Sequence, residues 1–572
     1  MTTNANARIG TGRGPVTTIA TTIVLALAAG LVATGTPAEA PLDLPTAVAA
    51  PAASVDPAIA AALDADGTVA VVVQVRDGDI AAVRELVTRH GGTVSVDLPI
   101  VDGFGATVTR DALAALADVP GITVTLDGEI DVSLESLLGS GDGGTTEEST
   151  GPTTPADTSY VQTIGAHRLH NKGVTGAGVG IAIIDTGVSE VGDLTGRIQG
   201  AVDLSGEGDH VDRFGHGTFI AGVAAGSGAA SKGEHAGVAP GAHIVPVKIA
   251  GRDGSADVTH VLAGIQYVVS FKDDHDIGVL NLSLGTNSTQ SWKTDPLNYA
   301  VQRAWDAGIV VVVSGANLGP GPQTVTKPAD DPLVITLGAV DAHATSDRAD
   351  DTMSDFSSRG PTASDGLVKP DLVAPGVSLV GLRAPDSFID TNYPKARIDT
   401  AYFRGSGTSF SAAVVTGAAA LLRQAHPDWT PDLIKGALMA TAAPGPVGSP
   451  NVDGAGSVDV AAASKLSAPP VANVGVGRSD GTGALDLSRG DLQVEIVTED
   501  VYDLAGNLIS TVTEVLTGET TAQDLLFDRE AYVLEWSKAR WYETDWNKAR
   551  WYKARWYDAD WQKARWYATD WK

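Results

Sequence analysis

The chain has 572 residues, too many for one ordinary hydrophobic core, so several domains are expected. Its 39 Lys or Arg against 69 Asp or Glu give a formal net charge of −30, which argues against nucleic acid as a general partner. Cysteine is absent, which excludes disulfides, a thiol nucleophile and thiolate metal sites. Without disulfides, a secreted protein must draw its stability from a large packed core or from bound ions.

The N-terminus has the features of an export signal. Arg8 and Arg13 precede an uncharged apolar run over residues 19–33, and small residues follow that run. The alternative is a membrane anchor, but the run is shorter than the roughly 20 residues that a span needs. Residues 1–40 are therefore predicted to be a signal peptide, and residues 41–66 a disordered lead. The processed protein is expected to be secreted.

A small α+β unit is predicted over residues 67–135. Short β-branched runs alternate with two segments of helical spacing, in the order βαββαβ. This order suggests a ferredoxin-like split βαβ module; an unrelated accessory domain is the alternative. The expected strands are 69–75, 93–96, 105–108 and 122–126, and the expected helices are 79–90 and 111–117.

A linker is predicted at residues 136–159. It is dominated by Gly, Ser, Thr, Pro and acidic residues and has no periodicity, so it cannot bury enough apolar surface to fold. Exposed links of this kind are where proteases cut. Maturation cleavage is expected here.

An α/β domain, with a parallel sheet covered by helices on both faces, is predicted over residues 160–468. Continuous apolar runs, typical of strands buried on both sides, alternate with helical segments. The expected strands are 179–184, 244–249, 279–284, 309–314 and 334–340, and the expected helices are 219–225, 255–271, 296–307 and 409–425.

Three short segments of this domain carry the parts of an activated serine. They are centred on Asp185, in Asp-Thr-Gly; on His216, in Gly-His-Gly-Thr; and on Ser409, in Gly-Thr-Ser-Phe-Ser-Ala. A hydroxyl is a poor nucleophile until a base takes its proton and a carboxylate orients that base. The glycines beside His216 are expected to let its ring face an open cleft. Asp-Thr-Gly also occurs in aspartic peptidases, but these need two such carboxylates and the chain has one motif.

In their order and local sequences, these segments resemble the subtilisin family of serine peptidases, over about residues 160 to 465. The resemblance implies that Asp185 orients His216, that His216 is the base and that Ser409 attacks the peptide carbonyl. Phe219 and Phe410 depart from the family pattern, which often has His and Met there. The helix that Ser409 is expected to open would also favour the negative charge formed during attack.

The resemblance extends to the oxyanion and substrate positions. Asn317, which follows an expected strand, stands where subtilisins place the amide that donates to the oxyanion. Gly315 and Ala316 before it look exchanged relative to the family's Ala-Gly-Asn, so a methyl at 316 would narrow the wall of the pocket. By the same resemblance, peptide substrate is expected to pair with a segment and contact a pocket formed by Ser283, Leu284, Gly285, Gly315 and Ala316.

The resemblance further implies that the 67–135 module is an inhibitory propeptide and that the partners are protein or peptide substrates. No cofactor is expected for catalysis. Subtilisins often carry structural calcium, but the sequence does not identify a set of ligands for it here. The alternative is a degenerate subtilisin fold that binds peptides or the cell surface. Retention of Asp185, His216, Ser409 and Asn317 together argues against degeneration.

The C-terminus ends in a tryptophan-rich repeat at residues 531–572, after a region at 469–530 predicted to be a linker or small β structure. Eight tryptophans recur every five residues from Trp536 to Trp571, a step that keeps to one side of neither a helix nor a strand. The segment from Trp536 onward contains nine Lys or Arg and five Asp or Glu. Cell-envelope binding is the favoured interpretation; a small repeat structure or a disordered tail are the others.

Overall fold

The computed structural model describes residues 53–55, 59, 67–76, 78–127, 158–254, 256, 258–286, 288–485, 487–488, 494–502, 508–517 and 540–541. The predicted signal peptide, most of the lead, nearly all of the linker and all of the repeat tail except 540–541 lie outside these residues. Within the described part of the chain, no helix is long and apolar enough to cross a membrane.

The N-terminal module contains the predicted strands and helices in the predicted order. In its sheet, of order β1-β5-β2-β4-β3, the central strand β2 pairs antiparallel with both β4 and β5. The sequence did not predict β1, a short edge strand parallel to β5. The elements are β1 Ser54–Val55, β2 Thr68–Val75, α1 Ile80–Arg89, β3 Thr93–Leu98, the 3-10 helix η2 Pro99–Val101, β4 Gly103–Thr109, α2 Arg110–Ala117 and β5 Ile122–Leu126.

The second domain is built on an eight-stranded sheet of order β12-β11-β10-β9-β6-β8-β7, in which β13 also pairs with β11. All of these pairs are parallel except the one between β11 and β12. Most strands are continuous apolar runs buried along their whole length, as expected for a parallel sheet covered on both faces. The strands are β6 Gly180–Asp185, β7 Val202–Asp203, β8 His243–Lys248, β9 Ile277–Leu282, β10 Val310–Ser314, β11 Ile335–Asp341, β12 Thr352–Met353 and β13 Leu372–Pro375.

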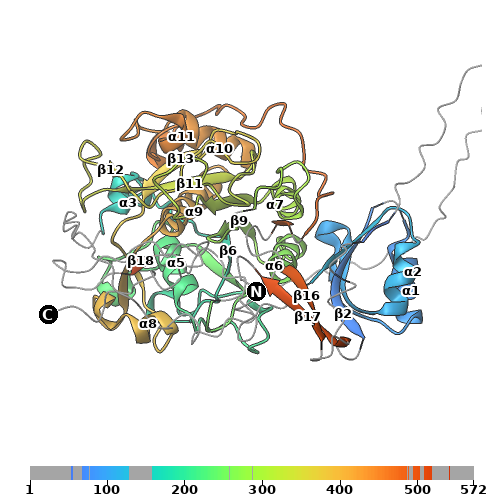
Figure 1. Cartoon of the computed structure of the whole chain (residues 1–572). Helices are drawn as coiled ribbons and strands as arrows, with labels where there is room; N and C mark the ends of the chain where they lie inside the picture. The colour runs from blue at the N-terminus through green and yellow to red at the C-terminus, as the bar shows by residue number, and fades with distance from the viewer. Residues whose placement is uncertain are drawn as a thin grey trace, which may run out of the picture. The chain divides into compact units, whose positions relative to one another are not determined.

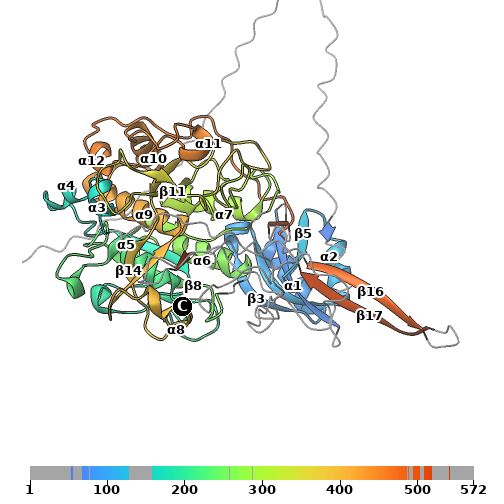
Figure 2. The same ribbon diagram turned by 60° about the vertical axis from the view of Figure 1, so that its left-hand side comes forward.

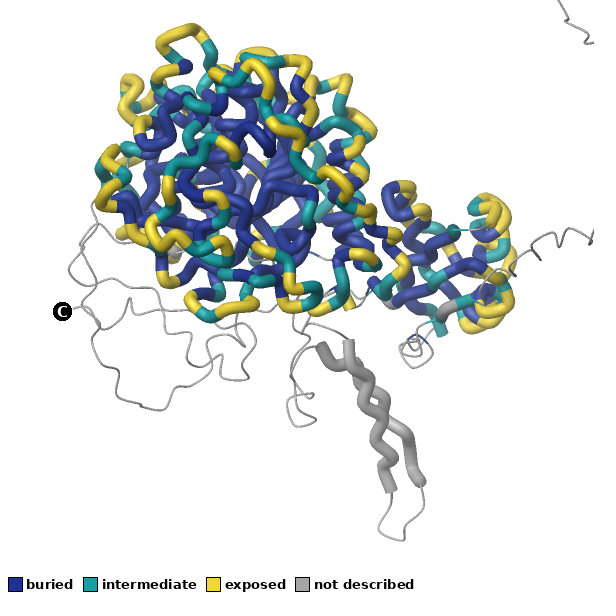
Figure 3. The backbone as a smooth tube through the Cα atoms, turned by 90° about the horizontal axis from the view of Figure 1, so that it is seen from above, coloured by how far each residue is buried: buried dark blue, intermediate teal, exposed yellow. Residues whose placement is uncertain are grey.

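Helices cover both faces of this sheet, so the predicted α/β class is confirmed. Figures 1 and 2 show α5 (His216–Ala225) and α9 (Thr408–Ala425) on one side and α6 (Val258–Ser270) and α7 (Pro296–Asp306) on the other. Every residue of α5 is buried, as is the first part of α9 through Leu422. Their many Ala and Gly residues allow such close packing. Figure 3 shows the buried backbone as the centre of the domain, beneath exposed loops.

The remaining elements are a second sheet, a two-stranded hairpin and a set of helices that are mostly short. A second sheet, β14-β15-β18, consists of β14 Leu379–Leu382, β15 Tyr402–Ser406 and β18 Arg540–Trp541. A two-stranded hairpin lies within the region at 469–530 where β structure was expected: β16 Val494–Tyr502 and β17 Leu508–Thr517. The short helices are α3 Tyr160–Thr163, α4 His167–His170, η4 Gly192–Leu194, η5 Ala229–Ser231, α8 Phe388–Asn392, η6 Pro394–Ala396, α10 Pro431–Ala440, α11 Pro450–Asp453 and α12 Val460–Ala463.

Candidate active site

Asp185 and His216 form a buried pair at the carboxyl edge of the parallel sheet. Asp185 is the last residue of β6, and His216 is the first residue of α5. The Nδ1 atom of His216 lies 2.9 Å from both carboxylate oxygens of Asp185, and both side chains are fully buried. The backbone N–H of Thr186 donates to Asp185 Oδ1 at 2.8 Å, which fixes the carboxylate. A carboxylate in this position holds the imidazole with its other nitrogen ready to accept a proton.

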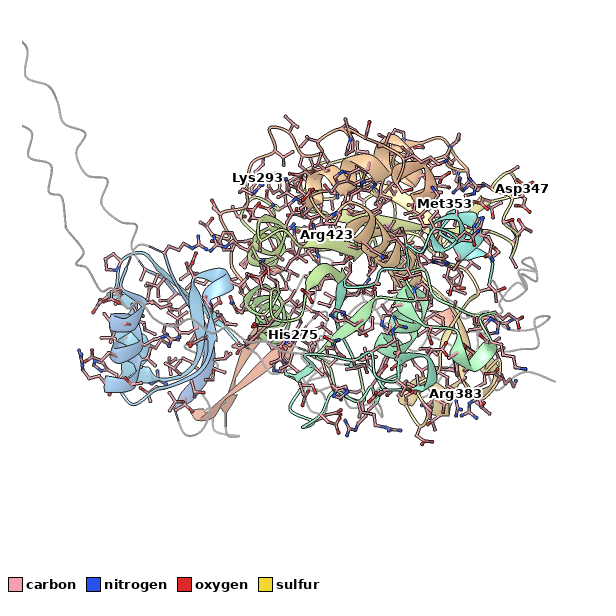
Figure 4. All side chains as sticks on the ribbon, turned by 180° about the vertical axis from the view of Figure 1, so that it is seen from behind. His275, Lys293, Asp347, Met353, Arg383 and Arg423 are labelled. Carbon is pink, nitrogen blue, oxygen red and sulfur yellow. The ribbon has the colours of Figure 1, made fainter. Side chains whose placement is uncertain are left out.

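The turn before His216 requires glycine. Gly215 has φ 112°, in the left-handed region that side chains avoid, and a Cβ on it would lie 2.6 Å from the Ser387 hydroxyl. Ser387 caps α8, the short helix at the lower edge of the domain in Figure 1. Arg383 holds α8 in place through two hydrogen bonds to Asp390, and its position near the domain edge is labelled in Figure 4. The packing of α8 against Gly215 thus fixes the position of the next residue, His216, at the start of α5.

The two departures from the family pattern contact each other. The ring centroids of Phe219 and Phe410 are 4.4 Å apart, and the Phe410 ring centroid lies 5.9 Å from that of His216. Phe219 lies on α5 and Phe410 on α9, so this contact joins the helix that carries the imidazole to the helix that carries Ser409. In this chain two aromatic rings therefore pack behind His216.

Ser409 lies in the first turn of α9. The helix begins one residue earlier than predicted, at Thr408 with Gly407 as its N-cap, so Ser409 does not itself open or cap the helix. Its hydroxyl donates to the Ser283 carbonyl at 3.4 Å, and the Ser283 hydroxyl lies 3.2 Å from the Ser409 carbonyl. These contacts place the serine of α9 beside the segment that follows β9.

The predicted open cleft around His216 is wrong for this conformation of the chain. His216 is fully buried and Ser409 is 1 % exposed. One reason is the aromatic packing of Phe410 against the imidazole.

Asn317 is oriented by the residue that precedes Ser409. Its side-chain oxygen accepts hydrogen bonds from the backbone N–H and the hydroxyl of Thr408, at 2.9 and 3.1 Å. The Nδ2 atom of Asn317 is buried and has no hydrogen-bond partner among the described residues. A buried amide donor without a partner is costly unless a ligand or substrate group uses it.

The predicted substrate segment lies beyond the end of β9 and is mostly buried. Leu284 is fully buried, and Ser283 uses its hydroxyl within the protein. A Cβ on Gly285 would meet the Thr326 hydroxyl at 2.4 Å, so this position needs glycine. Gly315 donates its N–H to the Leu337 carbonyl, and Ala316 has φ 82°, an unfavourable value for a residue with a side chain.

A buried carboxylate behind the pair, Asp212, was missed by the sequence reasoning. It accepts hydrogen bonds from the Thr186 hydroxyl at 2.9 Å, Gly215 N–H at 2.6 Å and Thr218 N–H at 2.8 Å. Burial raises its pKa to about 6, although the Thr218 and Gly215 N–H groups favour the ionised form. Its position four residues before His216 was the available signal.

No group of three or more His, Asp or Glu side chains is placed to hold a metal ion in the part of the chain that the structure describes. Structural calcium stays a prediction.

A serine in the first turn of one helix, packed against the helix whose first residue is an imidazole oriented by a carboxylate, at the carboxyl edge of a parallel sheet, is typical of an α/β serine hydrolase. The sequence profile described as the subtilase family matches residues 176–464. The chain therefore belongs to the subtilase family, whose enzyme class is serine endopeptidase.

Individual proteins similar to this chain are also named as serine proteases or subtilisins. Serine protease AprX of Bacillus subtilis is 40 % identical over 292 residues, which are 50 % of this chain and 66 % of AprX. Subtilisin Savinase of Lederbergia lenta is 33 % identical over 305 residues, 53 % of this chain and 97 % of Savinase. Subtilisin E of Bacillus subtilis is 29 % identical over 364 residues, 63 % of this chain and 80 % of the relative.

Proposed function

We propose that this chain is a secreted serine endopeptidase made as a precursor that its own N-terminal module inhibits. The observation that carries the catalytic part is the 2.9 Å contact between His216 Nδ1 and Asp185. His216 lies on α5, and α5 packs against α9, the helix that carries Ser409. A binding-only protein has no need of a buried, oriented imidazole, so the degenerate alternative is not favoured.

In the proposed reaction, His216 takes the hydroxyl proton of Ser409 as the oxygen attacks a peptide carbonyl. Asn317 Nδ2 and the backbone N–H of Ser409 donate to the oxyanion of the tetrahedral intermediate. His216 then gives the proton to the leaving amine, which departs with the C-terminal part of the substrate. Water, deprotonated by His216, releases the acyl group from Ser409.

A fluorophosphonate probe tests the nucleophile directly. The probe should label the parent chain at Ser409 and should not label Ser409→Ala. Ser411→Ala is the matched control, since Ser411 lies on the same helix but its hydroxyl donates to the Ala374 carbonyl at 3.0 Å. Casein hydrolysis at the parent rate by a folded Ser409→Ala protein would refute the mechanism.

Contacts of the N-terminal module support the precursor part of the proposal. Ile100 and Val101 of η2 are 3 % and 2 % exposed and belong to the same hydrophobic core as the second domain. The Tyr299 hydroxyl of α7 donates to the Asp102 carboxylate at 2.9 Å, and the Thr259 hydroxyl of α6 bonds to Asp127. Such apolar burial would hold the module on the enzyme until the linker is cut.

Ile100→Asp tests this contact in the full chain. A charge buried at η2 should weaken the module's hold, so proteolytic activity should appear earlier after folding than in the parent. Ala82→Asp, at an exposed neutral position of α1, makes the same change of charge and is the control that should leave the activation unchanged. The mass of the active form should place its N-terminus within residues 136–159; a start upstream of residue 130 would refute the propeptide role.

A further inference from the structure

Residues 470–488, which we call the strap, follow α12, and their described part packs along the second domain. The family profile matches residues 176–464, so the strap lies beyond the matched part of the chain. In Figure 1 it is the dark orange trace beside α7, and Arg478 bonds to Asp306 of that helix at 2.8 Å. Leu485 is 1 % exposed and belongs to the same hydrophobic core as the parallel sheet. The strap is therefore built into the domain.

A single buried carboxylate joins the end of the strap to the start of α7. Asp295 is fully buried and caps α7, because its Oδ1 atom accepts hydrogen bonds from the N–H groups of Leu297 and Asn298. Its Oδ2 atom accepts from the Ser488 hydroxyl and from the Gln290 side chain, both at 2.9 Å. Ser488 is itself fully buried. The end of the strap is thus fixed to α7 and to the loop that follows the predicted substrate segment.

The strap also reaches Thr286, the residue that follows the predicted substrate segment at 283–285. The Thr286 hydroxyl donates to the Ser488 carbonyl. The backbone N–H and carbonyl of Thr286 pair with Lys327, at 2.9 and 2.7 Å. Thr286 is 2 % exposed, so its polar groups are buried and each has a hydrogen-bond partner. The strap supplies the partner of the side chain.

The predicted substrate segment is therefore held at both ends. At its start, the Ser283 hydroxyl lies 3.2 Å from the Ser409 carbonyl, and the Ser409 hydroxyl donates to the Ser283 carbonyl at 3.4 Å. At its end, Thr286 is bonded to the strap. Leu284 and Gly285 lie between these two anchors. An extended peptide binds such a segment through main-chain hydrogen bonds, which weaken when the N–H and carbonyl groups move out of position.

We propose that the strap positions the substrate segment for an extended peptide, through the bond between the Ser488 carbonyl and the Thr286 hydroxyl. Both are positioning residues, because neither belongs to the predicted catalytic set, and the inference rests on the proposed function. Loss of this bond frees the far end of the segment but leaves its contact with α9. Peptide binding then weakens, while the reaction at Ser409 keeps its rate.

Thr286→Val tests the bond in the processed enzyme made from the full chain. Valine keeps the side-chain volume and the backbone pairing but has no hydroxyl, so KM for a peptide substrate should rise about threefold to tenfold at unchanged kcat. Thr286→Ser keeps the donor and should restore KM to near the parent value. Thr441→Val is the matched control, because its hydroxyl donates to the Ala437 carbonyl at 2.8 Å in α10; its KM should equal that of the parent.

A second variant changes the strap itself. Ser488→Ala removes the hydroxyl that anchors the strap to Asp295, so it should also raise KM. Thr286→Val and Ser488→Ala act on one contact, so the double variant should raise KM no further than the larger single change. Single effects that multiply in the double variant would show that Thr286 and the strap act independently, and would overturn the proposal.

Equal KM values for Thr286→Val and the parent would also overturn it, and a lower Tm of that variant would then assign the strap to stability alone. A small fluorophosphonate, which does not need the substrate segment, should label every variant at the parent rate. Absence of labelling in the parent enzyme would instead refute the proposed function. Peptide binding to chains carrying Ser409→Ala still decides the inference in that case, because Thr286→Val should raise Kd by the same factor as KM.

Discussion

The side-chain oxygen of Asn317 accepts two hydrogen bonds from Thr408, one from its backbone N–H at 2.9 Å and one from its hydroxyl at 3.1 Å. These bonds fix which end of the amide is the donor, so Nδ2 is held away from Thr408. The residue before the candidate nucleophile thus orients the candidate oxyanion donor.

Thr408→Val should therefore lower kcat without changing KM. The variant keeps the backbone N–H and the side-chain volume but loses one of the two bonds, so we expect a decrease of about threefold to tenfold. Asn317→Ala should cost far more, near the about 10²–10³-fold known for removing the oxyanion donor of subtilisin itself. Steady-state kinetics on one peptide substrate compares the two; equal kcat for Thr408→Val and the parent would contradict the orienting role.

Asp212 should make folding stability fall as pH rises from about 4 to about 6. Its pKa in the folded chain, about 6, lies above the usual value for an aspartate, so the folded state binds more protons in this window. The stabilising effect is complete below pH 4 and is lost as Asp212 ionises, with a total near 3 kcal/mol. Chemical denaturation in a Ser409→Ala background should show this slope, and the Asp212→Asn variant should lack it, so the difference in stability between the two proteins should change across this pH window. A pH-independent difference would mean that Asp212 does not titrate as argued.

Ala316→Gly should stabilise the fold and enlarge the pocket. Ala316 has φ 82°, and a left-handed conformation costs a residue with a Cβ about 1–2 kcal/mol. Loss of the methyl should also raise kcat/KM for substrates with a bulky residue before the cut bond. Gly315→Ala is the contrasting variant, because its Cβ would lie 2.8 Å from the Leu337 carbonyl, and it should destabilise. Thermal unfolding and kinetics on a matched substrate series measure both effects; a lower Tm for Ala316→Gly would contradict the strain argument.

Lys435→Met should destabilise the chain by about 3–5 kcal/mol. The buried ammonium donates to the carbonyls of Pro332 and Val334, at 2.8 and 2.9 Å, and lies 3.0 Å from Asp371 Oδ1. Burial lowers the pKa of Lys435 to about 8, but the charged form is held by these oxygens. Methionine would leave them unsatisfied. Lys465→Met, on an exposed side chain, is the control, and similar denaturation midpoints for the two variants would show that the buried cation is dispensable.

The sequence by itself determined the parallel α/β architecture and the positions of Asp185, His216 and Ser409 along it. Continuous valine and isoleucine runs predict buried strands, and small-residue helices beside glycine turns predict close packing, because both signals are local. Boundaries were off by one to three residues where caps decide them: α5 begins at His216 rather than 219, and α9 at Thr408 rather than Ser409.

Only the tertiary structure decided which distant groups meet. Asp212 lies near Asp185 in space, and Phe219 packs on Phe410 across two helices. Neither of these contacts leaves a periodic trace in the chain, because each depends on how separate elements cross. The apolar pattern of a segment predicts which of its residues are buried, because that pattern is local. Contacts between side chains that are far apart in the sequence depend on how the folded elements pack together.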